Sequence, residues 1–180
     1  MPDAIKQGSA KPLIPRVPPV LYNVEGDFKK YFEPRQVALG PLHHGNPKFE
    51  RAQQSKLKLA AFFVCKSETR DEAIFHNIKA EIYDLKKCYD PEDIEDYDDE
   101  KLAWMFFVDG CALLYAVYYG LPGQFKRYII DADLLVFSQL DLFFLENQLP
   151  YRVLKILISS TKEPRKWEQT INHRIHRLQH

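Results

Sequence analysis

The feature that most limits how this chain can fold is a nearly uninterrupted apolar run, LAWMFFVDGCALLYAVYY, at residues 102–119. The run approaches the roughly 20 residues that a membrane-spanning helix needs. However, Asp109 and Gly110 lie at its centre, where an aspartate costs roughly 3 kcal/mol in a membrane helix, and charged residues crowd its start at 99–101. We therefore expect no transmembrane span, but a buried pair of core helices bent at Gly110.

Composition agrees with a packed, neutral protein. Aromatic residues make up 13% of the 180-residue chain, well above the level of disordered sequences. The 25 basic residues balance the 25 acidic ones, which argues against a general binder of nucleic acids or of anionic membranes. We expect residues 1–12 to form a disordered tail and residues 13–180 to form the N-terminal portion of a single, truncated helical domain.

The cysteines indicate a reducing location. Cys65, Cys88 and Cys111 are odd in number and widely spaced, no C-x-x-C occurs, and no secretory signal opens the chain. We expect a cytoplasmic protein.

Prolines and apolar periodicity predict a mainly α, multi-helix globular domain with a proline-rich extended N-terminal segment, compatible with short strands. Residues 13–45 are rich in proline, so Val20–Tyr22 and Val37–Leu39 should be extended and wrap over the helices. Asn46-Pro47 should start the first helix, with Lys56 outward. A capping box from Thr69 to Glu72 should open a second helix. Its apolar stripe is Ile74, Ile78, Ile82, Leu85 and Tyr89.

The C-terminal part predicts further helices. Residues 133–159 read as a helical pair broken at Pro150, whose ring cannot continue a helix. Glu146, Asn147 and Gln148 should satisfy the backbone groups that this break releases. A last helix should follow Pro164. Its apolar stripe has no following partner, and its opposite side is basic; the stripe is Trp167, Ile171, Ile175 and Leu178.

Four groups of residues invite chemistry, and for each a structural role is the better explanation. His43 and His44 could ligate a metal, but two ligands make no site. Cys111 could be a nucleophile, but it lies in an apolar run beside an acid, Asp109. Glu146 could pair with Asp141 or Asp109 for acid–base work. The acidic run 90–100 lacks the spacing of a calcium loop. We therefore expect no catalytic, metal or cofactor site.

Four strings in this order resemble the plant family catalogued as domain of unknown function 247. They are IPRVPPVL (14–21), YFEPRQVALGPLHHG (31–45), DGCALL (109–114) and DLFFLENQLPYRVLKIL (141–157). The motif residues without a known role are His43, His44, Asp109, Gly110, Cys111, Glu146, Asn147, Gln148 and Pro150.

No enzymatic activity is established for the family, so the resemblance favours interaction or signalling over catalysis. Some members of the family are associated with self-recognition between pollen and stigma in grasses, and many are presumed to be membrane-associated. Members typically run to about twice this length and often end in a hydrophobic anchor, so a longer form could lie at the cytoplasmic face of the plasma membrane. The favoured hypothesis is a helical interaction or signalling module that acts through a protein partner. The alternatives are a truncated gene product without independent function and a Cys/His-dependent hydrolase.

Overall fold

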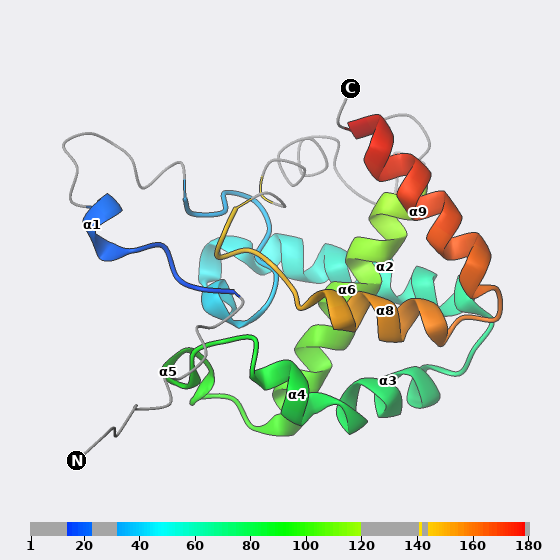
Figure 1. Cartoon of the computed structure of the whole chain (residues 1–180), viewed down its shortest axis with the longest axis horizontal. Helices are drawn as coiled ribbons and strands as arrows, with labels where there is room; N and C mark the ends of the chain where they lie inside the picture. Colours follow the sequence, from blue (N-terminus) through cyan, green and yellow to red (C-terminus); the bar gives the residue numbers. More distant parts are fainter. Residues whose placement is uncertain (1–13, 23–31, 120–140, 142–143, 179–180) are drawn as a thin grey trace, which may run out of the picture.

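The computed structural model describes residues 14–22, 32–119, 141 and 144–178, and these form the mainly α domain that the sequence predicts (Figure 1). No β-strand occurs within these residues, so the extended segments do not pair into a sheet there. The elements are α1 (Pro19–Tyr22), the 3₁₀ turns η2 (Pro41–His43) and η3 (Pro47–Phe49), α2 (Glu50–Ser67), α3 (Asp71–Ala80), α4 (Ile82–Lys86), α5 (Pro91–Ile94), α6 (Asp99–Tyr119), α8 (Tyr151–Ser159) and α9 (Pro164–Leu178).

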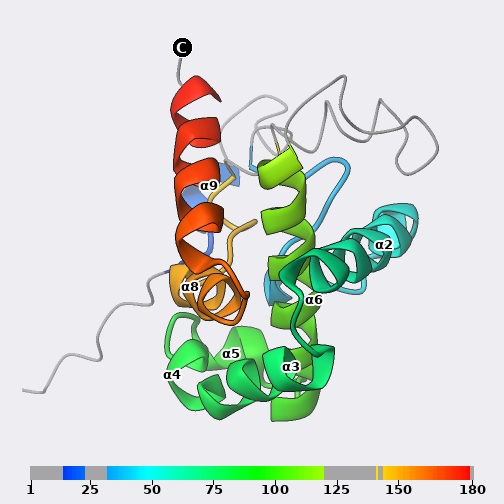
Figure 2. The same ribbon diagram turned by 90° about the vertical axis from the view of Figure 1, so that its right-hand side faces the viewer.

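Helix α6 is the centre of the core. It contacts α2, α3, α8 and α9, and Figure 2 shows it between α2 on one side and the pair α8–α9 on the other. It is apolar on all sides, as expected of a helix that other elements surround. In the described part of the chain it is the one helix long and apolar enough to cross a membrane, but 67% of its most apolar window is buried inside the fold.

The predicted bend at Gly110 is wrong, because α6 runs without a break from Asp99 to Tyr119. The glycine instead allows α8 to pack closely. A Cβ atom on Gly110 would lie 2.5 Å from Cδ1 of Leu157 and 3.0 Å from Cγ1 of Val153. A larger residue at this position would therefore force Leu157 and Val153 to shift.

The helices that follow Asn46 agree with the sequence pattern, but the second one differs from it in two respects. Asn46 caps a 3₁₀ turn that leads into α2, and its side chain accepts a hydrogen bond from the Lys48 N–H. The capping box is not formed, because the Thr69 hydroxyl bonds to the preceding Ser67 carbonyl and α3 begins without a side-chain cap. The predicted second helix is also divided at Glu81 into α3 and α4. Its stripe is nevertheless buried as predicted.

The two short apolar segments of the proline-rich region adopt different structures. Val37–Leu39 is extended and buried, as predicted, whereas Val20–Tyr22 belongs to the short helix α1. Pro19 suits the first position of that helix, since its fixed φ is helical and its missing N–H is not needed there. Residues 1–12, the predicted tail, lie outside the described residues.

Helix α8 begins directly after Pro150, where the sequence predicts a new helix. Pro150 occupies the N-cap of α8. Of the predicted helix over residues 133–145, only 141, 144 and 145 are described: Asp141 is helical, whereas 144 and 145 are not. The apolar stripe of α9 is not uncovered: Trp167 is 4% exposed, and its ring lies 4.9 Å from that of Phe63 and 4.1 Å from that of Tyr118. Ile171 is buried as well, and only Ile175 of the described stripe residues is exposed.

Candidate functional site

The buried segment 34–40 is the feature around which the polar motif residues gather. Val37, Ala38 and Leu39 are at most 8% exposed, although they lie in an extended segment without a neighbouring strand. Backbone N–H and C=O groups buried in this way need hydrogen-bond partners. Here the partners are side chains from distant parts of the chain.

Asp141 binds the beginning of this segment. Its carboxylate accepts the N–H groups of Arg35 at 2.9 Å, of Gln36 at 2.6 Å and of Val37 at 2.9 Å. The side chain itself is completely buried. Three amide donors directed at one carboxylate stabilise its charge.

Asn147 takes the place of a neighbouring strand. Its Oδ1 accepts the Leu39 N–H at 2.6 Å, and its Nδ2 donates to the Val37 carbonyl at 3.0 Å. The same amide nitrogen donates to the carbonyl of Asp141 at 2.9 Å. The side chain therefore satisfies both an acceptor and a donor of the buried segment and also binds the backbone of Asp141.

Lys56 and Asp109 bind the end of the segment. Lys56 Nζ donates to Asp109 Oδ1 at 2.5 Å and to the Ala38 carbonyl at 2.7 Å, while Asp109 Oδ2 accepts the Gly40 N–H at 2.8 Å. The prediction that Lys56 points outward is wrong, since it is 4% exposed. A signal was present: position 56 falls into the gap of the apolar stripe between Ala52 and Leu59.

Gly40 is required by geometry. Its φ is +70°, in the left-handed region, and a Cβ atom here would lie 2.9 Å from the Gln148 carbonyl oxygen and 3.0 Å from Tyr89 Oη. The Tyr89 hydroxyl donates to that same Gln148 carbonyl at 3.0 Å. Burial raises the pKa of Tyr89 well above its ordinary value, so the hydroxyl remains a donor.

Glu146 connects two further segments. Its Oε1 accepts the Val17 N–H at 2.7 Å, and its Oε2 lies 3.0 Å from His43 Nε2. Among the described residues this Nε2 is the one buried side-chain nitrogen or oxygen without a well-formed hydrogen bond, and the Glu146 carboxylate is the acceptor beside it. Burial lowers the pKa of His43 despite the neighbouring Glu146 carboxylate, which favours the neutral imidazole.

We call Lys56, Asp109, Asp141, Glu146 and Asn147 the polar clamp. The sequence predicts that the side chains of residues 146–148 satisfy the backbone groups released by the helix break at Pro150. This prediction is mostly wrong. Glu146 and Asn147 bind distant backbone instead, and the Gln148 side chain is exposed. The carboxylates considered from the sequence for acid–base chemistry also have structural partners. The oxygens of Asp109, Asp141 and Glu146 accept hydrogen bonds from backbone amides and from Lys56.

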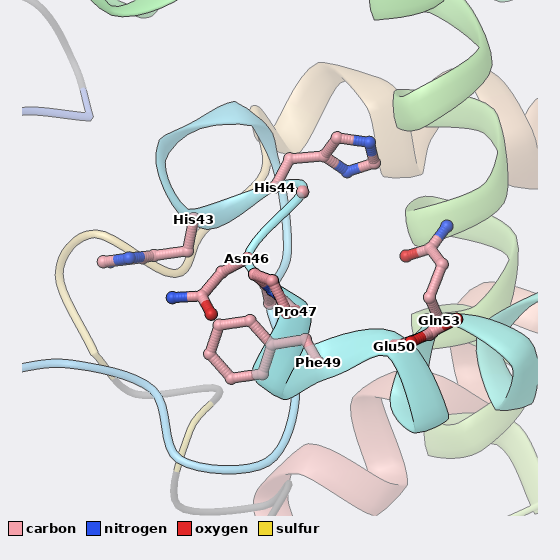
Figure 3. A pocket seen from close by; sticks show the side chains of 9 residues that line it. His43, His44, Asn46, Pro47, Phe49, Glu50 and Gln53 are labelled. Carbon is pink, nitrogen blue, oxygen red and sulfur yellow. The ribbon is translucent and has the colours of Figure 1, made fainter.

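The two histidines lie at a small surface hollow of about 340 Å³ (Figure 3). Its lining is Ala38, His43, His44, Gly45, Asn46, Pro47, Phe49, Glu50 and Gln53. Figure 3 shows the imidazoles of His43 and His44 pointing in opposite directions, so they cannot jointly ligate one ion. No group of three or more His, Cys, Asp or Glu side chains in the described part of the chain is arranged to hold a metal.

Cys111 lies inside α6 and is completely buried. Burial raises the pKa of its thiol well above the ordinary value. A cysteine nucleophile needs the thiolate form and access to a substrate, and Cys111 has neither property in this fold.

Comparison with known proteins shows the family of the chain. The family described as "Plant protein of unknown function", domain of unknown function 247, matches residues 14–179. The chain belongs to this family. It is also similar to the UPF0481 protein At3g47200 of Arabidopsis thaliana, with 30% identity over 140 residues, 74% of this chain and 29% of that protein. The chain thus spans less than a third of that relative's length, and no solved structure matches it.

The four strings that carry the family resemblance are the segments that meet at the polar clamp. Residues 14–21 supply the Val17 amide, and residues 31–45 supply the buried segment together with His43. Residues 109–114 supply Asp109, and residues 141–157 supply Asp141, Glu146 and Asn147, whereas Lys56 lies outside the four strings. In this chain the four strings and Lys56 therefore meet in one arrangement, which holds the backbone of residues 17 and 35–40 against the helices.

Proposed function

We propose that the chain is a helical protein-interaction module, in which the family motif residues fix the fold and exposed side chains contact a protein partner. The observation that carries this proposal is that the side chains of the polar clamp bind the backbone of their own chain. Its carboxylates, amide and ammonium bind backbone groups of residues 17 and 35–40. Groups engaged in this way position a chain and do not need to react with a substrate.

Exposed aromatic side chains supply the contact surface. Trp104 of α6 is 50% exposed, and its ring packs 5.8 Å from that of Phe75 and 5.4 Å from that of Phe107. Tyr83 is 73% exposed. Large aromatic side chains of this kind, backed by a firm core, are the residues that most often dominate protein interfaces.

The family resemblance supports a setting in recognition or signalling. We infer a location in the cytoplasm, or at the cytoplasmic face of the plasma membrane for a longer form. The hydrolase alternative finds less support, since the thiol of Cys111 is buried and the two histidines diverge.

Crosslinking capture from plant extract tests the proposal. The intact chain, carrying a photo-crosslinking residue at position 104, should capture specific proteins, and a recombinant form of the captured protein should then bind directly in calorimetry. Absence of any direct binder would count against an interaction module. Turnover of a panel of p-nitrophenyl esters that Cys111→Ser or His43→Gln abolishes would replace it with the hydrolase hypothesis.

A further inference from the structure

A groove of about 370 Å³ lies between α4 and α5, at the edge of the molecule. Both Figure 1 and Figure 2 show these two helices side by side, away from α9. Its walls include Tyr83, Pro91 and Tyr97, and Ile94 is buried beneath them. None of these residues takes part in the polar clamp.

The walls of the groove have the composition of a surface that binds polyproline helices. Tyr83 and Pro91 are exposed, and Tyr97 is half-buried. Both rings are anchored: Lys87 Nζ lies 4.1 Å from the centroid of Tyr83, and the Tyr97 hydroxyl donates to the Pro41 carbonyl at 3.4 Å. Proline-rich segments dock into grooves lined by such aromatic rings, because their extended helix is already formed before binding.

The charge around the groove selects for a basic ligand. The two lysines of the groove have acidic partners, with Lys86 2.8 Å from Asp99 and Lys87 2.7 Å from Asp84. Glu95 lines the groove, and the exposed Glu92 and Asp96 stand next to it on α5 and the following turn. The rim therefore presents negative charge to a ligand, which a positive side chain would complement.

The same corner of the fold already binds a proline-flanked arginine from its own chain. Arg16, which lies between Pro15 and Val17-Pro18 in the sequence, forms an ion pair with Asp93 of α5. Two residues earlier, the Ile14 N–H donates to the Cys88 carbonyl at 2.9 Å, directly after α4. The α4–α5 corner thus recognises an extended Pro-Arg segment by one backbone bond and one ion pair.

We propose that the α4–α5 groove binds an extended, proline-rich peptide of a partner protein that carries an arginine or lysine. The proline rings would pack between Tyr83, Pro91 and Tyr97, and the basic side chain would reach Glu95. This inference rests on the proposed interaction function and names the chemical class of the partner.

Fluorescence anisotropy with the intact chain tests the groove. The probe is a fluorescein-labelled peptide of sequence Pro-Pro-Pro-Arg-Pro-Pro-Leu-Pro, and we expect saturable binding with a Kd below about 1 mM. Tyr83→Ala should weaken binding about tenfold, since it removes an aromatic wall. Tyr151→Ala is the matched control, because Tyr151 is equally exposed at 73% but lies on α8 outside the groove.

Two further variants separate the proline and the charge contributions. A peptide with alanine at every proline should lose binding at least tenfold, and Glu95→Lys should weaken the arginine peptide while improving a version with glutamate in its place. Absence of saturable binding, equal loss in Tyr83→Ala and Tyr151→Ala, or equal binding of the alanine peptide would each overturn the groove proposal. If a captured partner still binds Tyr83→Ala normally, the interaction function stands and the groove fails.

Discussion

Lys56 Nζ lies 2.5 Å from Asp109 Oδ1 in the core, where the side chains of the two residues are 6% and 1% exposed. The pair joins α2 to α6, and each member also binds the backbone of the buried segment 34–40. It therefore links three parts of the fold through one ammonium and one carboxylate.

Removing one member of this pair should be strongly destabilising. Lys56→Met leaves the Asp109 carboxylate buried without its cation and the Ala38 carbonyl without its donor, so the free energy of unfolding should fall by about 3–5 kcal/mol. Guanidinium chloride unfolding measures the loss. Lys162→Met is the matched control, since Lys162 forms a 2.8 Å ion pair with Glu68 at the surface and should leave the midpoint nearly unchanged. Similar midpoints for the two variants would contradict the structural role of Lys56.

Replacing the Asn147 amide with a carboxylate should destabilise the folded chain. Asn147→Asp keeps the shape of the side chain but replaces an NH₂ that donates to two carbonyls with an oxygen that repels them. We expect a loss of about 3 kcal/mol in urea unfolding, because the carboxylate cannot donate to the carbonyls of Val37 and Asp141. Gln148→Glu makes the same chemical change at an exposed neighbour and should have little effect. An unchanged urea midpoint in the Asn147 variant would argue against the two contacts that the amide donates.

The sequence predicts local structure well here because local periodicity decides it. The stripe from Ile74 to Tyr89 and the cap at Asn46 depend on spacings of three or four residues, and both are confirmed apart from the break at Glu81. The buried, inert Cys111 also follows from its apolar neighbours.

The polar clamp could not be found in this way. Asp141 and its partner Arg35 are 106 residues apart, and no periodic pattern connects a carboxylate with a distant backbone amide. The same holds for Glu146 and Val17. Lys56 is a different case, since its place in a buried stripe was visible, but lysine is so rarely buried that the pattern favoured an outward side chain.

Stability should decrease as the pH falls below neutrality. Burial lowers the pKa of His43 and of His44 below the ordinary value of 6.5, so the unfolded chain binds more protons than the folded one. The stabilising contribution is therefore complete above pH 6.5 and is lost as the pH falls through the lowered values. Urea midpoints at pH 7.5 and 5.5 measure this difference. His43→Gln should reduce it, and an unchanged difference between the two pH values in this variant would contradict the contribution of His43.

The three thiols should react with iodoacetamide in the order of their exposure. Cys65 is exposed, Cys88 is half-buried with its pKa raised by burial, and the pKa of the buried Cys111 is raised further. Mass spectrometry of the native chain should therefore find Cys65 labelled first, and Cys111 labelled only after denaturation. Labelling of native Cys111 as fast as Cys65 would contradict this burial and favour the hydrolase hypothesis.

Gly110→Ala should destabilise the protein through a steric conflict with α8. The new methyl group would lie 2.5 Å from Leu157 Cδ1, so α6 and α8 must move apart or Leu157 must change its rotamer. Overpacking of this kind typically costs about 1–3 kcal/mol, which outweighs the gain in helix propensity from glycine to alanine of about 1 kcal/mol. Because the closest conflict is with Leu157, adding Leu157→Ala to Gly110→Ala should destabilise less than the sum of the two single substitutions, in a double-mutant cycle from thermal or urea unfolding. Strict additivity would mean that Gly110 serves the backbone of α6 itself, as a bend would require, and not its contact with α8.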